Sequence, residues 1–274
     1  MHRFALVSSN SPIGIFDSGV GGLTVAHAVS DLLPQEQLIY FGDSAHLPYG
    51  DKSAATIQAY SIKICDVLLS KGCKLILIAC NSASSAAYEL IKAYVGSKAH
   101  VLNVIDPVVD HVVHHYAKRK VGLIGTRQTI GSGVYDYQIS VKDASIEVGS
   151  LATPLLVPMI EEGFHNDNIS EAIISEYLKN AALQGIEGLI LGCTHYPLIK
   201  KEIRHHLGVN VEVIDSALIV AQALQSFLKA QDLSNEKRKG DNEFIVSDIT
   251  PSFEKAASLF FGSEIELIQH KLWE

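Results

Sequence analysis

Two of the four cysteines follow short apolar segments, and each is followed by a polar pair. Cys80 stands in IACNS and Cys193 in LGCTH, both directly after a predicted buried strand. A cysteine between a strand and a helix N-terminus experiences the positive end of the helix dipole, so we expect its pKa to fall below about 8.5. A thiolate can be a nucleophile, a metal ligand or a base. A lone cysteine is more often a structural core residue, but two in matching contexts favour shared chemistry.

Two groups that can hold protons lie close to these cysteines in the pattern. Asp17 follows an apolar segment that we expect to be the strand next to the one ending at Cys80, and His195 comes two residues after Cys193. Carboxylates and imidazoles are the side chains that usually accept or donate protons beside a thiol. The residue types therefore predict proton transfer.

Short apolar segments alternate with segments of helical periodicity, which is typical of an α/β fold with largely parallel sheets. Ligands bind at the carboxyl ends of the strands in such sheets, where the residues above are expected. The predicted strands are 13–16, 37–42, 75–79, 101–105, 121–125, 188–192 and 211–215, and the predicted helices include 21–33, 56–70 and one opening near 82.

A weak internal repeat divides the chain. The segment 121–125 resembles 13–17, and 188–192 resembles 75–79. We expect two similar, doubly wound α/β domains with mainly parallel sheets and the active site in the cleft between them. The predicted first domain is 1–105 plus 213–274, and the second is 106–212.

The C-terminal part is expected to return to the first domain. A polar segment, 231–242, is predicted to be a solvated loop after a helix that ends near 230. A strand over 243–248, a helix over 253–262 and a last strand over 264–269 are expected to follow.

Two loops could contact a ligand. The segment 17–25 is glycine-rich but lacks the G-x-G-x-x-G spacing, and Asp17 would repel a pyrophosphate. Its backbone N–H groups could hold a carboxylate, or the glycines could only form a tight turn. In 42–53, Tyr49 lies between Pro48 and Gly50 and offers a hydroxyl or a backbone contact, unless the loop is only a fixed turn.

Composition excludes several classes of function. The 274 residues are 47% hydrophobic and 19% charged, with a net charge of −8, so a packed core is expected and nucleic acid or anionic membrane partners are not. No signal peptide and no apolar segment of about 18 residues is visible, which makes the cytoplasm the expected compartment, with free thiols.

The sequence also predicts that no metal or cofactor takes part. His111, His114 and His115 share a helix face, but no cysteine or acidic ligand set accompanies them. No P-loop, HExxH or G-x-S-x-G motif occurs, and no lysine lies in a recognisable pyridoxal-phosphate site.

Four motifs together resemble the glutamate racemase family. They are DSGVGGLTV (17–25), YFGDSAHLPYG (40–50), ACNSAS (79–84) and LGCTHYPLI (191–199), in the family's order. The resemblance implies two α/β domains, no pyridoxal phosphate, and interconversion of L- and D-glutamate that supplies peptidoglycan synthesis. It also implies a homodimer.

The resemblance assigns roles to individual residues. Cys80 would deprotonate D-glutamate with help from Asp17, and Cys193 would deprotonate L-glutamate with help from His195. Glu161 matches a family acid near the substrate amine. The implied substrate-binding residues are Asp17, Ser18, Pro48, Tyr49, Gly50, Asn81, Ser82, Thr126, Thr194 and His195.

Three positions depart from the family pattern. Ser82 replaces a usual Thr, His46 a common Arg, and Gln128 a usual Ala. These changes bear on substrate affinity, since none replaces a predicted base.

Two other interpretations of the function are compatible with the sequence. A related two-cysteine enzyme could act on aspartate, hydantoins or maleate instead. A two-lobed amino-acid sensor is also compatible with such a fold, although it would have no use for two reactive thiols in one cleft.

Overall fold

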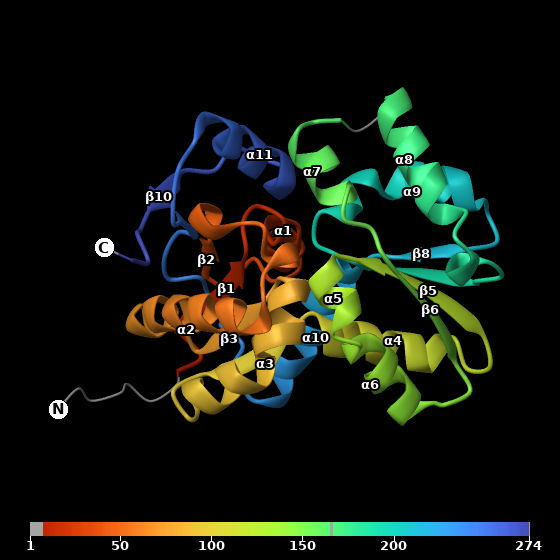
Figure 1. Cartoon of the computed structure of the whole chain (residues 1–274). Coiled ribbons are helices and arrows are strands. Elements are labelled where there is room, and N and C mark those ends of the chain that lie inside the picture. Colours follow the sequence, from red (N-terminus) through yellow and green to blue (C-terminus); the bar gives the residue numbers. More distant parts are fainter. Residues whose placement is uncertain (1–7, 165–166, 274) are drawn as a thin grey trace.

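The computed structural model describes residues 8–164 and 167–273, which form two lobes, each built around one parallel sheet (Figure 1). The first lobe has the strand order β10-β9-β2-β1-β3-β4. Its strands are β1 (Ile13–Asp17), β2 (Leu38–Gly42), β3 (Leu75–Ile78), β4 (His100–Asn103), β9 (Glu243–Val246) and β10 (Leu267–Gln269).

Helices cover both faces of this sheet, which is why its central strands are continuous apolar segments. Ile13 and Ile15 of β1 pack in one hydrophobic cluster, whereas Phe16 packs in another on the opposite face. The first cluster is completed by α1 (Leu23–Leu32), α10 (Ser216–Ala230) and α11 (Pro251–Phe261), and the second by α2 (Ala54–Ser70) and α3 (Asn81–Val95).

The second lobe repeats this plan with the strand order β6-β5-β7-β8. Its strands are β5 (Lys120–Gly125), β6 (Glu147–Ala152), β7 (Gly188–Gly192) and β8 (Glu212–Ile214). Its helices are α4 (Ile105–His115), α5 (Arg127–Gly131), α6 (Val134–Lys142), α7 (Leu156–Glu161), α8 (Asn168–Leu178) and α9 (Lys200–Leu207).

In each sheet the strands that follow the first strand lie on both sides of it. The prediction of two doubly wound, parallel α/β units is therefore confirmed. In the first lobe the chain moves from β1 to β2 on one side and to β3 on the other, and in the second from β5 to β6 and to β7. Such a reversal leaves a crevice at the carboxyl ends of the two diverging strands. Cys80 and Cys193 follow β3 and β7, which are equivalent strands.

The sequence prediction missed β6 and misplaced several ends. β6 is an edge strand with mostly half-exposed residues, so its apolar pattern is weak. β4 ends at Asn103 because its amide oxygen accepts hydrogen bonds from Ile105 and Asp106 and begins α4. β8 ends at Ile214, just beyond the predicted domain boundary, and α10 carries the chain back to the first lobe.

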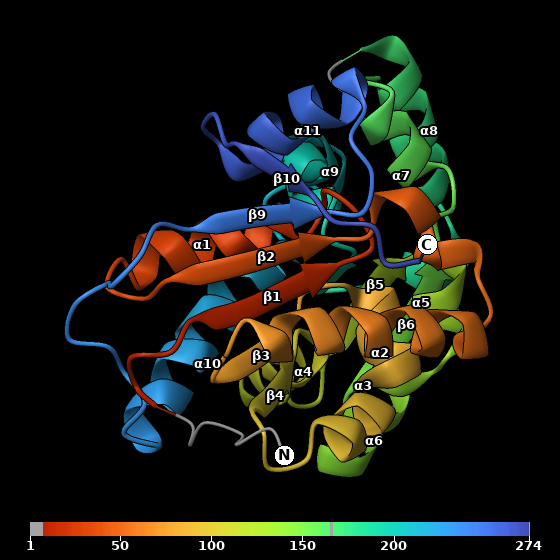
Figure 2. The same cartoon turned by 90° about the vertical axis from the view of Figure 1, so that its left-hand side faces the viewer.

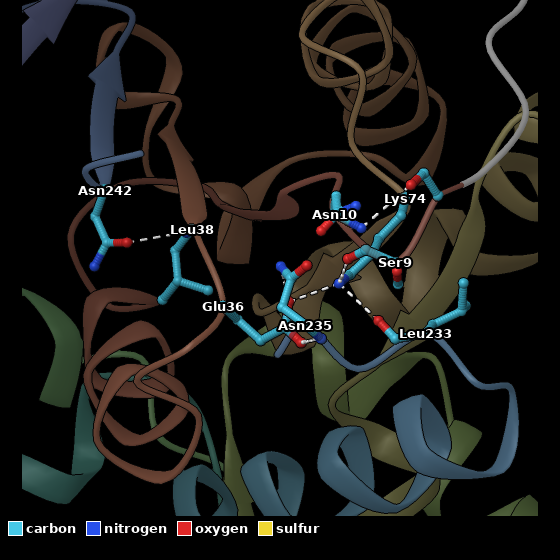
Figure 3. Close-up of polar contacts among 9 residues, drawn as sticks. Ser9, Asn10, Glu36, Leu38, Lys74, Leu233, Asn235 and Asn242 are labelled. Carbon is cyan, nitrogen blue, oxygen red and sulfur yellow. Dashed lines mark hydrogen bonds and ion pairs between the residues drawn. The ribbon is translucent and has the colours of Figure 1, made fainter. Parts of the chain in front are cut away.

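A buried ion pair fastens the returning chain to the first sheet (Figure 3). Lys74 Nζ lies 2.6 Å from Glu36 Oε2 and donates to the carbonyls of Ser9 at 2.6 Å and Leu233 at 2.8 Å. The Asn235 N–H donates to Glu36 Oε1 at 2.7 Å. A buried charge pair is tolerated when its hydrogen bonds are satisfied. Leu233 and Asn235 are therefore buried, and the prediction of a solvated loop over 231–242 was wrong at these two residues.

The C-terminal strands complete the first lobe. β9 pairs in parallel with β2, and β10 with β9, at the edge of the sheet that is visible in Figure 2. Within the described residues, no helix is both long and apolar enough to cross a membrane.

Candidate active site

One pocket lies between the lobes, at the carboxyl ends of both sheets, and both Cys80 and Cys193 line it. Of the other predicted site residues, the pocket wall includes Ser18, Pro48, Tyr49, Gly50, Asn81, Ser82, Thr126, Glu161, Thr194 and His195. The fold thus brings together residues from four separate motifs.

Cys80 caps the N-terminus of α3. Its sulfur accepts the Ala83 N–H at 3.4 Å and lies 3.7 Å from Ser18 Oγ. Burial and the nearby Asp17 carboxylate raise the pKa of the Cys80 thiol to about 12. The expectation of a lowered pKa was therefore wrong for Cys80, because desolvation and a like charge outweigh the helix terminus.

Asp17 lies behind Cys80 and is completely buried. Its Oδ2 accepts the Gly19 N–H at 2.9 Å. Burial raises the pKa of this carboxyl group, although the charge of His195 and the loop N–H groups oppose the shift. The glycine-rich loop therefore holds a carboxylate of the protein itself, that of Asp17.

Cys193 belongs to a different arrangement, a chain of three side chains. Its sulfur lies 3.7 Å from His195 Nδ1, and His195 Nε2 lies 2.8 Å from Glu161 Oε1. Burial opposes a charged imidazole, but the contacts with Cys193 and Glu161 outweigh it and raise the pKa of His195 to about 10. These contacts favour the charged form of the ring, which can balance a negative charge on the Cys193 sulfur.

The ring of His195 is further fixed by packing. The Phe260 ring of α11 meets it edge to face at 5.0 Å between centroids. The C-terminal segment therefore contributes to the wall behind the Cys193 side of the pocket.

Two adjacent glycines allow the 17–25 loop to pass between the catalytic candidates. A Cβ at Gly21 would lie 2.2 Å from Thr194 Oγ1 and 2.5 Å from His195 Nδ1, and a Cβ at Gly22 would lie 2.5 Å from Asp17 Cβ. Thr24 Oγ1 donates to the Thr194 carbonyl at 3.1 Å. The loop is a close contact between the lobes as well as a tight turn.

The 42–53 loop is organised by Asp43, which is fully buried and which sequence reasoning missed. Its carboxylate accepts hydrogen bonds from Tyr49 Oη at 2.6 Å and Ser247 Oγ at 2.7 Å, and lies 2.7 Å from His46 Nδ1. The Tyr49 hydroxyl is thereby occupied, so Tyr49 meets the pocket with its ring or backbone. A signal for Asp43 was its place directly after β2, one residue beyond the position that pairs with Asp17 at the end of β1.

Hydroxyl groups from the two lobes meet on another wall of the pocket. Ser82 Oγ lies 2.9 Å from Thr126 Oγ1, which lies 3.1 Å from Thr129 Oγ1. Beside them, Tyr135 Oη donates to Asn81 Oδ1 at 2.7 Å. Sequence reasoning missed Tyr135, because it lies within a helix and away from every strand end.

The second lobe contributes two polar wall residues that were not predicted, Arg127 and Thr153. Thr153 Oγ1 lies 2.7 Å from Tyr196 Oη, and both side chains are buried. Thr153 follows β6, the strand that the pattern did not reveal, so its place at a strand end could not be recognised.

The histidines of α4 lie away from this pocket. His111 and His115 stack with ring centroids 4.3 Å apart. Over the part of the chain that the structure describes, no group of three or more His, Cys, Asp or Glu side chains could hold a metal ion.

Sequence and structure comparisons relate the chain to known proteins. The family model described as Asp/Glu/Hydantoin racemase matches residues 23–224. The glutamate racemase of Chlorobaculum tepidum is 40% identical over 94% of this chain and 95% of its own length, and that of Chlorobium phaeobacteroides is 42% identical over 94% and 96%.

A solved relative has the same overall structure. The crystal structure of the Francisella tularensis glutamate racemase in complex with D-glutamate is 39% identical, with a TM-score of 0.90 over 96% of this chain and 98% of that one. The resemblance drawn from the four motifs is thereby confirmed, and the chain belongs to the Asp/Glu/Hydantoin racemase family.

Proposed function

We propose that this protein is a glutamate racemase that transfers the α-proton of its substrate between two cysteines, with no metal or organic cofactor. One observation carries the proposal: Cys80 and Cys193 line one pocket from equivalent strand ends, each with its own proton-holding partner. The nature of the relatives favours glutamate over aspartate, hydantoins or maleate.

The proposed reaction begins with L-glutamate at Cys193. The Cys193 thiolate, balanced by the His195 imidazolium, removes the α-proton, and the C–H electron pair passes into the substrate carboxylate. The Cys80 thiol, whose proton is firmly held, then donates to the opposite face of the carbon and becomes the thiolate. The reverse sequence, with Asp17 assisting Cys80, converts the D-isomer.

Other groups in the pocket can stabilise the intermediate. Asn81, Ser82 and Thr126 provide donors that can meet the negative charge as it develops on the carboxylate. Glu161 is bonded to His195 and also lines the pocket, so we assign it to holding the imidazolium and to the substrate ammonium group.

The proposal extends to the biological setting. D-glutamate made by the enzyme would supply peptidoglycan synthesis in the cytoplasm, and the active protein would be a homodimer. Both statements rest on the similarity to glutamate racemases.

The experiment that tests the proposal is racemisation in deuterated water without added pyridoxal phosphate. D-Glutamate formed from L-glutamate should carry deuterium at Cα, measured by chiral chromatography and mass spectrometry. Cys80→Ala and Cys193→Ala should each abolish racemisation, whereas Cys65→Ala removes a buried thiol outside the pocket and should leave it intact. Turnover retained in either active-site variant would refute the two-thiol scheme.

The same assay applied to aspartate and hydantoins, and a chromatographic assay of fumarate formed from maleate, test the substrate. A turnover number for one of these that exceeds the value for glutamate would overturn the substrate assignment while leaving the chemistry in place.

A further inference from the structure

A tyrosine of the second lobe reaches the residue next to Cys80. Tyr135 lies in the first turn of α6 and is almost completely buried. Its hydroxyl donates to the side-chain oxygen of Asn81, the first residue of α3 in the first lobe, at 2.7 Å. This hydrogen bond joins the two lobes beside the pocket.

The direction of the bond follows from the chemistry of the phenol. Burial raises the pKa of Tyr135 well above its usual value, and the negative charges of Asp106 and Cys193 add to the effect. The hydroxyl therefore keeps its proton and donates it, and among the described residues its only acceptor is Asn81 Oδ1. The amide of Asn81 is thus fixed in one of its two orientations.

The NH₂ group of the same amide indicates a ligand site. Asn81 Nδ2 is buried, and within residues 8–164 and 167–273 it has no hydrogen-bond partner. Asn81 is 2% exposed and lines the pocket. A buried donor without a partner costs roughly 1–3 kcal/mol, so such a group at a pocket wall indicates a ligand acceptor.

The surroundings of Asn81 favour a carboxylate as that acceptor. Asn81 opens a 15-residue helix, whose N-terminus favours anions. The hydroxyls of Ser82 and Thr126 lie on the same wall. Thr126 donates to Thr129 and lies 2.9 Å from Ser82, and each of these two hydroxyls can turn its proton toward a ligand. A carboxylate accepts several such bonds at once.

We propose that Tyr135 is a positioning residue, which holds the Asn81 amide so that its NH₂ group faces the carboxylate of the bound amino acid. The inference rests on the proposed function for the identity of that amino acid. Without the tyrosine hydroxyl the amide can turn over and present its oxygen to the carboxylate, which repels it.

Calorimetric binding of D-glutamate to the full chain tests this role. Tyr135→Phe should raise the Kd about five- to tenfold, the effect of one lost hydrogen bond. Asn81→Ala should raise it at least as much. In the Asn81→Ala background, Tyr135→Phe should have no further effect, because the tyrosine acts only through that amide.

Tyr116→Phe is the matched control. Tyr116 is also a buried tyrosine of the second lobe, and its hydroxyl donates to Glu212 at 2.7 Å, outside the pocket. This variant should lower the melting temperature while leaving the Kd within twofold. In racemisation assays Tyr135→Phe should raise KM more than it lowers kcat.

The inference would be overturned if the Kd of Tyr135→Phe lay within twofold of that of the unaltered chain. It would also be overturned if Tyr135→Phe raised the Kd as much in the Asn81→Ala background as in the unaltered chain, or if Tyr116→Phe raised the Kd as much as Tyr135→Phe. Binding of D-glutamate without racemisation would overturn the proposed function alone, since the Kd comparison still decides the role of Tyr135. An unaltered chain that binds no glutamate would overturn both.

Discussion

The two sides of the pocket have the same backbone plan and different chemistry. Cys80 and Cys193 follow equivalent strands of similar sheets, and their side chains are similarly buried. Cys80 has a buried carboxylate, Asp17, behind it, which strengthens its hold on a proton. Cys193 has a charged imidazole beside it, held by Glu161. The fold thus decides where the thiols lie, and their neighbours give each thiol a different electrostatic environment.

The largest expected effect comes from removing one partner at a time. His195→Asn and Asp17→Asn should each lower kcat/KM by about 10²- to 10⁴-fold, the usual contribution of a group that assists proton transfer. The fall must be equal in both directions, because the two enantiomers have equal free energies in water.

Substrate isotope effects then show whether proton transfer at Cys193 or at Cys80 has been slowed. With α-deuterated substrates, His195→Asn should increase the isotope effect for L-glutamate and reduce it for D-glutamate, because proton transfer at Cys193 becomes limiting. Asp17→Asn should do the opposite. The same pattern in both variants would contradict the assignment of one partner to each thiol.

The alkylation rates of Cys193 and Cys80 should differ by at least about tenfold. At pH 7 Cys193 should react with iodoacetamide first, since a pKa of about 12 leaves Cys80 almost entirely protonated. Raising the pH toward 10 should narrow the ratio of the two alkylation rates, because the fraction of Cys80 present as thiolate continues to grow.

Peptide mapping by mass spectrometry measures both rates in one sample. Cys65 and Cys73, whose pKa values burial raises to about 12, serve as slow internal references. Faster labelling of Cys80 than of Cys193 would reverse the comparison.

Substitutions at the adjacent Gly21 and Gly22 allow the Cys193 side and the Cys80 side to be disturbed separately. Each should lower the free energy of unfolding by about 1–3 kcal/mol. Gly21→Ala should displace Thr194 and His195, and should slow the alkylation of Cys193. Gly22→Ala should press on Asp17 and leave Cys193 labelling nearer its normal rate. Thermal unfolding provides the control, since both variants should be destabilised to a similar degree. Identical labelling profiles would show that the loop transmits strain to both sides.

The smallest effect is expected at the mouth of the pocket. Arg127 and Asp51 form a largely exposed ion pair between the lobes, at 2.8 Å. Exposed pairs contribute about 1 kcal/mol or less, so Arg127→Gln should change KM less than about fivefold, and less still in high salt. Steady-state kinetics at two ionic strengths checks this. A larger change in KM would mean that Arg127 contacts the substrate.

Sequence reasoning identified every described strand except β6, and singled out both thiols, because these features depend on local patterns. Continuous apolar segments such as IGIF and LILI marked the central strands, and the residues after them were the site candidates. It could not place Tyr135 or Asp43, whose importance depends on contacts with distant segments.

The electrostatics of the site were also beyond local patterns. The helix N-terminus at Cys80 was visible in the sequence, but the extent of burial and the position of Asp17 behind the sulfur were not. Since those two effects outweigh the helix dipole, the direction of the pKa shift required the three-dimensional structure.

The anchoring of Lys74 has a consequence for the order in which the protein is made. While the C-terminal part is still inside the ribosome, the nascent chain lacks the Leu233 carbonyl and the Asn235 amide that join the Lys74–Glu36 pair. It also lacks β9 and β10, whereas all four strands of the second lobe have already been released. The lobe whose strands β1 to β4 are translated first is therefore the lobe whose sheet is completed last.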